Sequence, residues 1–422
     1  MKKHAFEYFC KMLYSKIHNK EFAGESKMRE QDFSRSRKFS FGDTVGVVLN
    51  KTGRGVRSAI NAYRESVKKD EMTYSQQAFS KGRQRIKWEA FRELHQFSVA
   101  EFYKEYDFKT YRGYRVSAID GTKLSLPYHK DTITEFGVQK SSGDQTQALG
   151  SCLCDVLNGV VMDALLDRYN ANERTLAEQH IEYLSKIKTD KELLLFDRGY
   201  PSAKLIELLN EHNFLFLMRT SPEFLKSILK KMTGDDCVVM HKFQQAKQEN
   251  PIRVLRVKIS TTETEEYLVT NIFDSSFTPE DFAFLYHLRW GIETRYNDLK
   301  NRLKIEQFTG TTPLAIRQDY YATMLLLNMT AMLIAENEDT VNALHNSAEN
   351  KYLYKTNMNY TIELLKKDVI NLLIYAGRPK GRKLFRHIKR ELSLAVIPVR
   401  NDRSFPRTPS HPSNKFSQNM KP

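Results

Sequence analysis

The sequence predicts an α/β fold in which helices pack on a mixed β-sheet. Three strand-like units begin at about residue 113, and helix-like and strand-like segments then alternate up to about residue 220. A β-rich insertion follows at about 221–276. We therefore expect a core domain over 113–335, between a helical region at 1–112 and a further helical region at 336–399.

The clearest helix of the N-terminal region begins near residue 76. Thr73 or Ser75 would cap it, and an imperfect apolar face runs through the segment to about residue 97. Such a helix can enter a DNA groove, as helix-turn-helix readers do, and an ordinary amphipathic helix with a charged outer face fits equally well. The basic residues on its polar side, which would face DNA, are Arg83, Arg85 and Lys87.

Two strand pairs are expected at the start of the core. The segment YRVSAIDGTKLSLP alternates between apolar and polar residues, and Asp120-Gly121 marks a turn near its middle. In ALGSCLCDVLNGVVMDALLDRY, two more strands meet at Asn158-Gly159, a strong hairpin signal. Asp120 would thus stand at the end of an apolar strand.

Helices and strands then alternate. A helix with Asn170 or Asn172 as its cap precedes KELLLF, a short apolar run typical of a fully buried strand. Asp197 ends that run. Pro201 and Ser202 open the next helix, and FLFLMRT predicts another strand.

The insertion contains three β-rich stretches, CVVMHKF, IRVLRVKIS and EEYLVTNIF. One long helix is expected after it, from Thr278 to about Leu303. The apolar stretch from Tyr320 to Ala335 reads as a core helix, because it is too short for an ordinary membrane span. Residues 400–422 contain four prolines and little apolar content, so we expect a disordered basic tail.

The positive charge lies at the two ends of the chain. The net charge of +15 comes from 66 basic and 51 acidic residues. Residues 1–112 carry +10, residues 378–422 carry +10, and the middle carries −5. Basic flanks around a mildly acidic centre fit DNA-binding regions beside a carboxylate site, and a solvated basic surface is the alternative.

The cysteines predict no zinc site. The four cysteines, at positions 10, 152, 154 and 237, show no paired metal-binding spacing, and Cys152 and Cys154 lie in an apolar run. We expect these two to be buried and reduced, in a cytosolic setting. The N-terminus lacks an uninterrupted apolar segment, so no secretory signal is expected.

Three acidic residues are candidate metal ligands. Asp120 and Asp197 follow apolar strands beside glycines, and Glu293 lies on the long helix. Carboxylates held at strand ends suit Mg²⁺, which takes oxygen ligands. Taken singly, each Asp is more often a turn former or a helix cap, and Glu293 can form a salt bridge with Arg289.

Four side chains form a ridge on the expected long helix. At about 100° per residue, Tyr286, Arg289, Glu293 and Lys300 fall within a stripe roughly 60° wide. The carboxylate can hold a divalent metal, while Arg289 and Lys300 can hold phosphates. This combination indicates phosphodiester chemistry. Trp290, next to Arg289, is expected to pack against the sheet.

The order strand-Asp, strand-Asp, helix-Glu resembles the DDE catalytic triad of RNase H-like transposases. The ridge matches, in residue types and spacing, the YREK signature of bacterial insertion-sequence transposases of the IS-four type. The β insertion before the helix is also similar to that group, and the resemblance covers about 113–335. It implies an RNase H-like catalytic core, and the basic region 1–112 is similar in position to the group's end-binding domain.

The resemblance implies roles for individual residues. Asp120, Asp197 and Glu293 would ligate two Mg²⁺ ions, for which Mn²⁺ can substitute. Arg289 and Lys300 would contact phosphates near the cleaved end, and Tyr286 would bond the same backbone. Asn170 and Glu173 resemble a polar segment before the family's core helix, where a helix cap is the expected role.

The implied function is that of a DNA transposase in the bacterial cytoplasm. It would bind the terminal inverted repeats of its element, cleave there and join a 3′-OH to target DNA, as a homodimer that holds both ends. A transposase-derived DNA-binding protein and a metal-dependent nuclease without strand transfer are the alternatives. For a hairpin pathway the insertion would have to supply a stacking aromatic. It contains no Trp, and the sequence does not choose among Phe224, Phe243 and Tyr267.

Overall fold

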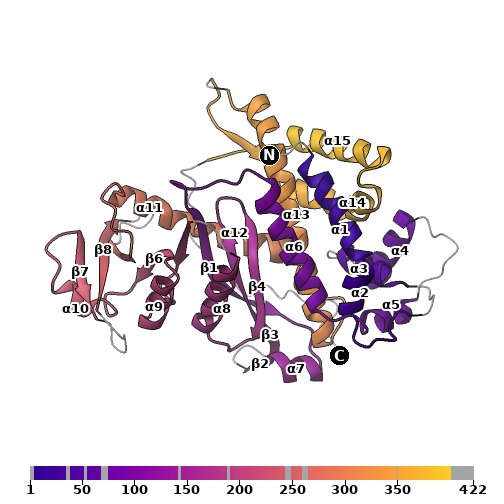
Figure 1. Ribbon diagram of the computed structural model, residues 1–422, viewed down its shortest axis with the longest axis horizontal. Coiled ribbons are helices and arrows are strands. Elements are labelled where there is room, and N and C mark those ends of the chain that lie inside the picture. The colour runs from indigo at the N-terminus through magenta and orange to yellow at the C-terminus, as the bar shows by residue number, and fades with distance from the viewer. Residues whose placement is uncertain are drawn as a thin grey trace. The chain divides into compact units, whose positions relative to one another are not determined.

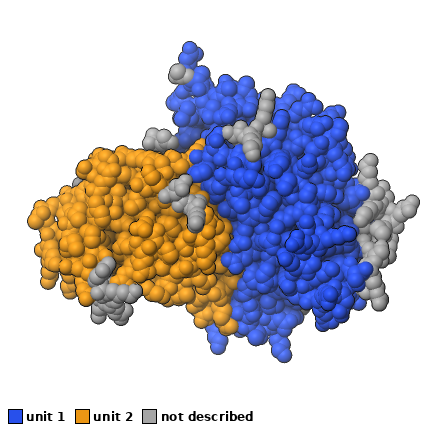
Figure 2. All heavy atoms as spheres, in the orientation of Figure 1, with its two compact units in different colours: residues 1–108, 124–148, 297–422 blue, residues 109–123, 149–296 orange. Residues whose placement is uncertain are grey.

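The computed structural model describes the chain in nine stretches and divides it into two compact units (Figure 2). Unit 1 comprises Met1–Phe108, Leu124–Ala148 and Asn297–Pro422, and unit 2 comprises Lys109–Lys123 and Leu149–Tyr296. The described residues are 4–34, 39–51, 55–67, 75–140, 144–187, 191–242, 249–258, 265–347 and 349–400.

Unit 1 is built around one long buried helix, α13 (Pro313–His345). Thr312 caps its first turn, and almost every side chain from Ala315 to Leu333 is buried. N-terminal and C-terminal helices both pack on α13, so the two ends of the chain share one core (Figure 1). This confirms the core helix expected at Tyr320 to Ala335. None of the described helices is long and apolar enough to span a membrane.

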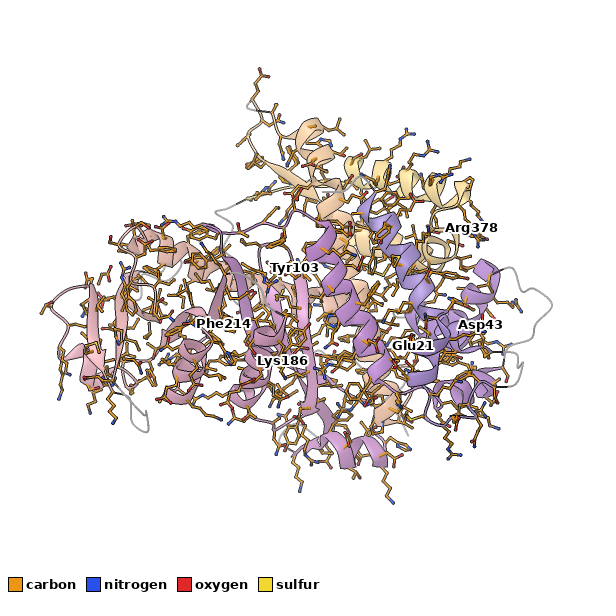
Figure 3. All side chains as sticks on the ribbon, in the orientation of Figure 1. Glu21, Asp43, Tyr103, Lys186, Phe214 and Arg378 are labelled. Carbon is orange, nitrogen blue, oxygen red and sulfur yellow. The ribbon has the colours of Figure 1, made fainter. Side chains whose placement is uncertain are left out.

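The helices around α13 have these bounds: α1 Ala5–Ile17, α2 Lys20–Glu25, α3 Phe41–Leu49, α4 Val56–Val67, α5 Gln76–Arg83, α6 Glu89–Glu105, α7 Lys130–Phe136, α14 Met358–Tyr375 and α15 Pro379–Leu394. Polar side chains fix several of their starts. Asp43, labelled in Figure 3, lies on α3. It closes a capping box with Ser40 and accepts a hydrogen bond from the Tyr63 hydroxyl at 2.8 Å. Two short strands, β10 (Tyr354–Thr356) and β11 (Val396–Pro398), pair antiparallel.

The single helix expected from residue 76 to about 97 is wrong. Ser75 caps α5 as expected, but α5 ends at Arg83 and α6 begins at Glu89. The backbone between them pairs with another segment instead: the Lys87 N–H donates to the Ser26 carbonyl, and the Arg85 carbonyl accepts from Met28, both at 2.9 Å. Thr73 and the expected tail after residue 400 lie outside the described residues.

A mixed sheet forms the core of the α/β fold, which confirms the expected fold class. Its strand order is β2-β3-β1-β5-β6-β9-β8-β7, with β4 on β3. β1 runs parallel to β5, and β5 parallel to β6, whereas β9, β8 and β7 are antiparallel to their neighbours. The bounds are β1 Arg115–Ser125, β2 Val138–Gln139, β3 Gln145–Asp155, β4 Val160–Arg168, β5 Glu192–Phe196, β6 Leu215–Thr220, β7 Asp236–His241, β8 Asn250–Lys258 and β9 Glu265–Thr270.

The β-rich segment after β6 extends this sheet. β9 pairs with β6 over Leu217–Thr220, so the strands of the insertion continue the core sheet. A four-residue helix, α10 (Lys226–Leu229), comes before them. The three strands expected from the sequence are confirmed, and they join the core sheet through the pairing of β9 with β6.

The turn expected at Asp120-Gly121 is wrong. β1 is one strand of 11 residues, and Asp120 lies within it. The hairpin at Asn158-Gly159 is confirmed: β3 and β4 flank it, and Gly159 adopts a φ of 69°, which favours glycine. Asp120-Gly121 and Asn158-Gly159 are similar dipeptides, so the local sequence alone does not decide which of them forms a turn. Pairing with neighbouring strands decides it.

Two helices of unit 2 flank β5: α8 (Glu173–Lys186) precedes this strand, and α9 (Ala203–Glu211) connects it to the parallel strand β6. The Asn172 side chain caps α8, and Ser202 caps α9. Both caps were expected. Cys152 and Cys154 are buried on β3, as expected, and neither forms a disulfide bond.

The single long helix expected from Thr278 to Leu303 is also wrong. Thr278 caps α11 (Pro279–Leu288), which is followed by α12 (Trp290–Asn297) and by a π-helical turn over Asp298–Arg302. At the junction the Arg289 N–H donates to the Tyr286 carbonyl, a three-residue step that tightens the helix. The predicted ridge assumes one continuous helix with a rotation of about 100° per residue. That assumption does not hold along this segment.

Candidate active site

The two aspartates lie at matching positions in neighbouring segments: Asp120 is in β1, and Asp197 directly follows β5. β1 and β5 are parallel, with Ala118 opposite Leu195. Asp120 and Asp197 each come two residues later, so both extend from the same level of the sheet. Side chains alternate along a strand, and the same offset places both carboxylates on the same face.

The α11–α12 junction supplies the third carboxylate and two further polar groups. Arg289, between the helices, donates from Nη2 to Oε1 of Glu293 at 3.0 Å. Its Nη1 lies 3.9 Å from Oδ2 of Asp120. The Tyr286 hydroxyl donates to Oδ1 of Asp197 at 3.0 Å. The helix ends thus connect to both aspartates, and the salt bridge expected as an alternative for Glu293 is present.

Arg289 is the cation of this cluster, and it is 3% exposed. Its Nε is buried without a hydrogen-bond partner. Burial alone would lower the pKa of Arg289, but Tyr286, Asp197 and Glu293 outweigh it and raise the pKa. A permanent positive charge therefore lies among the carboxylates.

The two aspartates have opposite electrostatic environments. Burial raises the pKa of Asp120 to about 6; the Gly121 N–H and Arg289 oppose this, and Asp197 and Glu173 add to it. Burial also acts to raise the pKa of Asp197, but Arg289, the Arg198 N–H and Tyr286 outweigh it, so the pKa is lowered. The surrounding positive charge and hydrogen bonds thus offset burial at Asp197 but not at Asp120.

Neighbouring side chains hold the framework. The Tyr296 hydroxyl of α12 donates to the Asp120 carbonyl, which ties this helix to β1. Arg219 on β6 pairs with Glu266 on β9 at 2.6 Å. Burial, followed by the Asp197 carboxylate, raises the pKa of the Tyr286 phenol, so this phenol stays protonated as a donor.

Two residues that sequence reasoning did not assign to the site belong to this environment. Glu173, in the first turn of α8, would lie 3.0 Å from a Cβ placed on Gly121. Tyr200, three residues after Asp197, is 2% exposed, and its hydroxyl has no hydrogen-bond partner. The sequence signal for Glu173 was its place directly after the cap residue Asn172, which also fits an ordinary first-turn acid.

The donor set fits a hard divalent cation by chemistry. Carboxylate and phenol oxygens are the groups available, and Mg²⁺ and Mn²⁺ prefer oxygen ligands. The unpartnered Tyr200 hydroxyl and the raised pKa of Asp120 both indicate a place where a positive or polar group is missing. Across the part of the chain that the structure describes, no three His, Cys, Asp or Glu side chains are close enough to form a ready metal cluster.

The comparison with protein families assigns the chain. The family described as "Transposase DDE domain" matches residues 111–329, just over half of the chain and all three candidate carboxylates. The chain belongs to the DDE transposase family. Its members generally use divalent metal ions, in agreement with the donor set.

Among solved structures, this DDE transposase resembles the piggyBac transposase in its synaptic complex with hairpin DNA. The identity is 11%, the TM-score is 0.48, and the match covers 90% of this chain and 84% of that one. No curated protein matches the chain.

Two residues near the ridge lie elsewhere than the sequence predicted. Lys300 is in the π-helical turn, which belongs to unit 1, whereas Tyr286, Arg289 and Glu293 belong to unit 2. Trp290, which was expected to pack against the sheet, is 47% exposed. Of the aromatics considered for base stacking, Phe224 and Tyr267 are half-buried, and Phe243 lies outside the described residues.

The prediction that Arg83 faces DNA is wrong. Arg83 is 4% exposed, and its guanidinium forms a salt bridge with Asp319 at 2.5 Å and hydrogen bonds with Gln318 and Thr309. Lys51 reaches the same carboxylate at 3.1 Å. Arg83 therefore joins α5 to α13 inside the transposase's helical unit.

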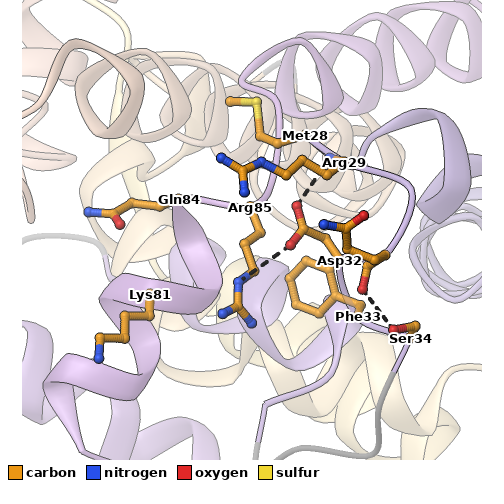
Figure 4. Close-up of a pocket in the computed structure, with 9 residues that line it drawn as sticks. Met28, Arg29, Asp32, Phe33, Ser34, Lys81, Gln84 and Arg85 are labelled. Carbon is orange, nitrogen blue, oxygen red and sulfur yellow. Dashed lines mark hydrogen bonds and ion pairs between the residues drawn. The ribbon is translucent and has the colours of Figure 1, made fainter.

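Arg85 and Lys87 lie in the connection between α5 and α6. Lys87 donates to the Glu25 carbonyl at 2.8 Å. Arg85 lies 3.5 Å from Asp32 and lines a pocket of about 800 Å³ (Figure 4). Three cations and one carboxylate surround this pocket, which gives it a positive charge. Its lining residues are Met28, Arg29, Gln31, Asp32, Phe33, Ser34, Lys81, Gln84 and Arg85.

Proposed function

We propose that this DDE transposase binds the terminal inverted repeats of a bacterial insertion sequence of the IS-four type, cleaves there and joins a 3′-OH to target DNA. The observation that carries the proposal is the equal offset of Asp120 and Asp197 from the paired residues Ala118 and Leu195 of the parallel strands β1 and β5. Arg289 lies 3.9 Å from Asp120 and hydrogen-bonds to Glu293. The YREK spacing of Tyr286, Arg289, Glu293 and Lys300 supports the finer assignment.

Asp120, Asp197 and Glu293 are the proposed ligands of two Mg²⁺ ions, or of Mn²⁺ in their place. When bound, such ions supply an activated water or 3′-OH and neutralise the leaving oxygen. The protein fixes its carboxylates through backbone contacts: Asp120 accepts from the Gly121 N–H at 2.9 Å, and its carbonyl is held by Tyr296. Rigid ligands suit Mg²⁺, which demands near-ideal octahedral geometry.

Arg289 and Lys300 are the proposed phosphate contacts. Arg289 is permanently charged and largely withdrawn from water, so its attraction to developing negative charge is only weakly screened. Tyr286 keeps its proton and holds Asp197 through a hydrogen bond of 3.0 Å. Its proposed role is to orient that carboxylate and the adjoining DNA backbone.

Unit 1 is the proposed source of DNA-end binding. Residues 1–112 carry +10, and the pocket that contains Arg29, Lys81 and Arg85 offers several cations to phosphates. Arg85 and Lys87 stay as proposed contacts, whereas Arg83 does not. Because both element ends must be held during reaction, a homodimer is proposed for the synaptic complex, acting on DNA in the bacterial cytoplasm.

The direct test is a strand-transfer assay. The full-length protein is incubated with Mg²⁺, a pre-cut duplex carrying the element's terminal repeat, and a supercoiled target plasmid. Joining of the labelled end to the plasmid supports the proposed function. Cleavage of uncut ends without joining would favour a nuclease, and end binding without any cleavage would favour a transposase-derived DNA-binding protein.

A further inference from the structure

The start of α8 is fixed against the loop that carries Asp197. The Asn172 side chain caps the helix by accepting the Arg174 N–H at 2.9 Å. The Arg174 side chain then donates from Nε to the Gly199 carbonyl, also at 2.9 Å. Gly199 is two residues beyond Asp197, so the first turn of α8, which contains Glu173, is tied to this loop.

Glu173 lies against the backbone of β1 beside Asp120. A Cβ on Gly121 would be 3.0 Å from Oε1 and 3.1 Å from Cδ of Glu173, closer than ordinary side-chain contacts. No positive φ explains this glycine, because Gly121 continues an extended strand. The space that Gly121 leaves is therefore used by the Glu173 carboxylate.

A buried polar network anchors the middle of α8 to the same strands. His180 contacts Asp163 of β4 through Nδ1 at 2.9 Å and Ser151 of β3 through Nε2 at 3.1 Å. The Ser151 hydroxyl lies 3.4 Å from the Asp120 carbonyl. All three network residues are at most 1% exposed, so they cannot meet a substrate and instead hold α8 and β1 in place.

Tyr200 supplies an independent sign of a missing ligand. Its ring is 2% exposed, and its hydroxyl is buried without a hydrogen-bond partner. Burial raises the pKa of this phenol, and Asp120, Glu173 and Asp197 raise it further, so the hydroxyl keeps its proton and can donate. A buried donor without a partner is rare in proteins and indicates a water or an ion that completes the site.

We propose that Glu173 is a fourth carboxylate of the divalent-metal site, and that the Tyr200 hydroxyl is a positioning group that donates to a water held by the metal. This assignment rests on the proposed function, since it adds a ligand to the site of Asp120 and Asp197. Glu173 belongs to α8, whereas Glu293 belongs to α12. The contact at Gly121 gives it a fixed position.

An acid in the first turn of a helix also stabilises the helix dipole, and this role predicts a different outcome. Loss of a dipole contact lowers stability without changing metal affinity. Loss of a metal ligand lowers metal affinity whether or not stability changes. The matched control is Glu178, which is on the same helix and pairs with the exposed Lys204 at 2.6 Å.

The test is calorimetric titration of the full-length protein with Mn²⁺ in the absence of DNA. Glu173→Gln is expected to weaken Mn²⁺ binding about 10–100-fold, while Glu178→Gln binds like the wild type. Gly121→Ala is expected to weaken binding as well, since its Cβ displaces Glu173. Tyr200→Phe is expected to show a smaller loss. Thermal unfolding and DNA-end binding are measured for each variant to confirm that it is folded.

The same titration separates the two proposals. If Asp120→Asn weakens Mn²⁺ binding and folded Glu173→Gln does not, the fourth-carboxylate proposal is overturned while the proposed function stands. If the wild type binds no Mn²⁺, or if Asp120→Asn binds it with unchanged affinity, the proposed metal site is overturned. The proposed role of Glu173 is then overturned as well. Weakened binding in both variants supports both proposals.

Discussion

Arg289 is the positive charge that lies among the carboxylates of the candidate site. It pairs with Glu293 at 3.0 Å and lies 3.9 Å from Asp120. Replacing a preorganised charge at a reacting phosphate typically lowers the rate about 10²–10³-fold. We expect Arg289→Ala to lose this much in single-turnover cleavage of a terminal-repeat duplex. Arg295→Ala, on the adjoining helix α12, is the control, and equal losses in the two variants would argue against a specific role for Arg289.

The second prediction at the residue scale concerns the contribution of Arg83 to stability. Its buried salt bridge with Asp319 joins α5 to α13. Removing one partner of a buried pair typically costs about 3–5 kcal/mol, and Lys51 beside Asp319 should keep the loss near the lower figure. Arg83→Met should therefore lower the free energy of unfolding by about 3 kcal/mol in urea titrations. A loss of DNA affinity without a loss of stability would restore Arg83 as a DNA contact.

The same pair gives the folded state an acid sensitivity. Burial would raise the pKa of Asp319, but Arg83 and Lys51 outweigh it, so the folded pKa lies below the ordinary value of 3.8. A depressed carboxyl pKa stabilises the folded state above the unfolded pKa, and this contribution is lost as the pH falls through the folded pKa. The free energy of unfolding should therefore fall as the pH drops below about 4.

At the scale of elements, the α11–α12 junction decides where Glu293 lies. Gly291, in the first turn of α12, has little room for a further atom: a Cβ there would be 3.1 Å from Cβ of Val156. Gly291→Ala should shift α12 and cost about 1–3 kcal/mol of folding stability, with slower cleavage. Gly234→Ala is the control, because a Cβ at Gly234 meets nothing within 4 Å. Unchanged stability and cleavage in Gly291→Ala would show that the junction tolerates movement.

Local chemistry explains which elements the sequence predicts well. The caps Asn172 and Ser202 and the hairpin glycine Gly159 act on their own neighbours, so their patterns predict the structure correctly. The turn at Asp120-Gly121 was wrong because Gly121 serves a contact with Glu173, more than 50 residues away. The helix breaks after Arg83 and at Arg289 were missed since each depends on partners elsewhere in the fold.

The candidate site shows the same division. The two aspartates and Glu293 stand out by their positions relative to strands and helix, and the structure brings all three near Arg289. The roles of Glu173 and Tyr200 depend on the packing of α8 against β1 and on a buried hydroxyl. Neither feature has a sequence pattern of its own.

At the scale of the whole molecule, the distribution of charge predicts how DNA binding depends on salt. Each cation that contacts a phosphate adds about one to the slope of log affinity against log salt concentration. Arg85→Ala should reduce this slope by about one, and Arg29→Ala, in the same pocket, should do likewise. Fluorescence anisotropy of a labelled terminal-repeat duplex between low and moderate salt measures it. Slopes equal to that of the wild type would remove the pocket from the DNA interface.

The central claim is that Asp120, Asp197 and Glu293 form one site that cuts DNA. Single-turnover cleavage of a terminal-repeat duplex with Mg²⁺ tests it most directly, using the wild type and the variants Asp120→Asn, Asp197→Asn and Glu293→Gln. We expect the wild type to cleave, and each variant to lose cleavage entirely while binding the duplex with nearly unchanged affinity. A folded variant that binds the duplex and cleaves it at the wild-type rate would contradict the claim.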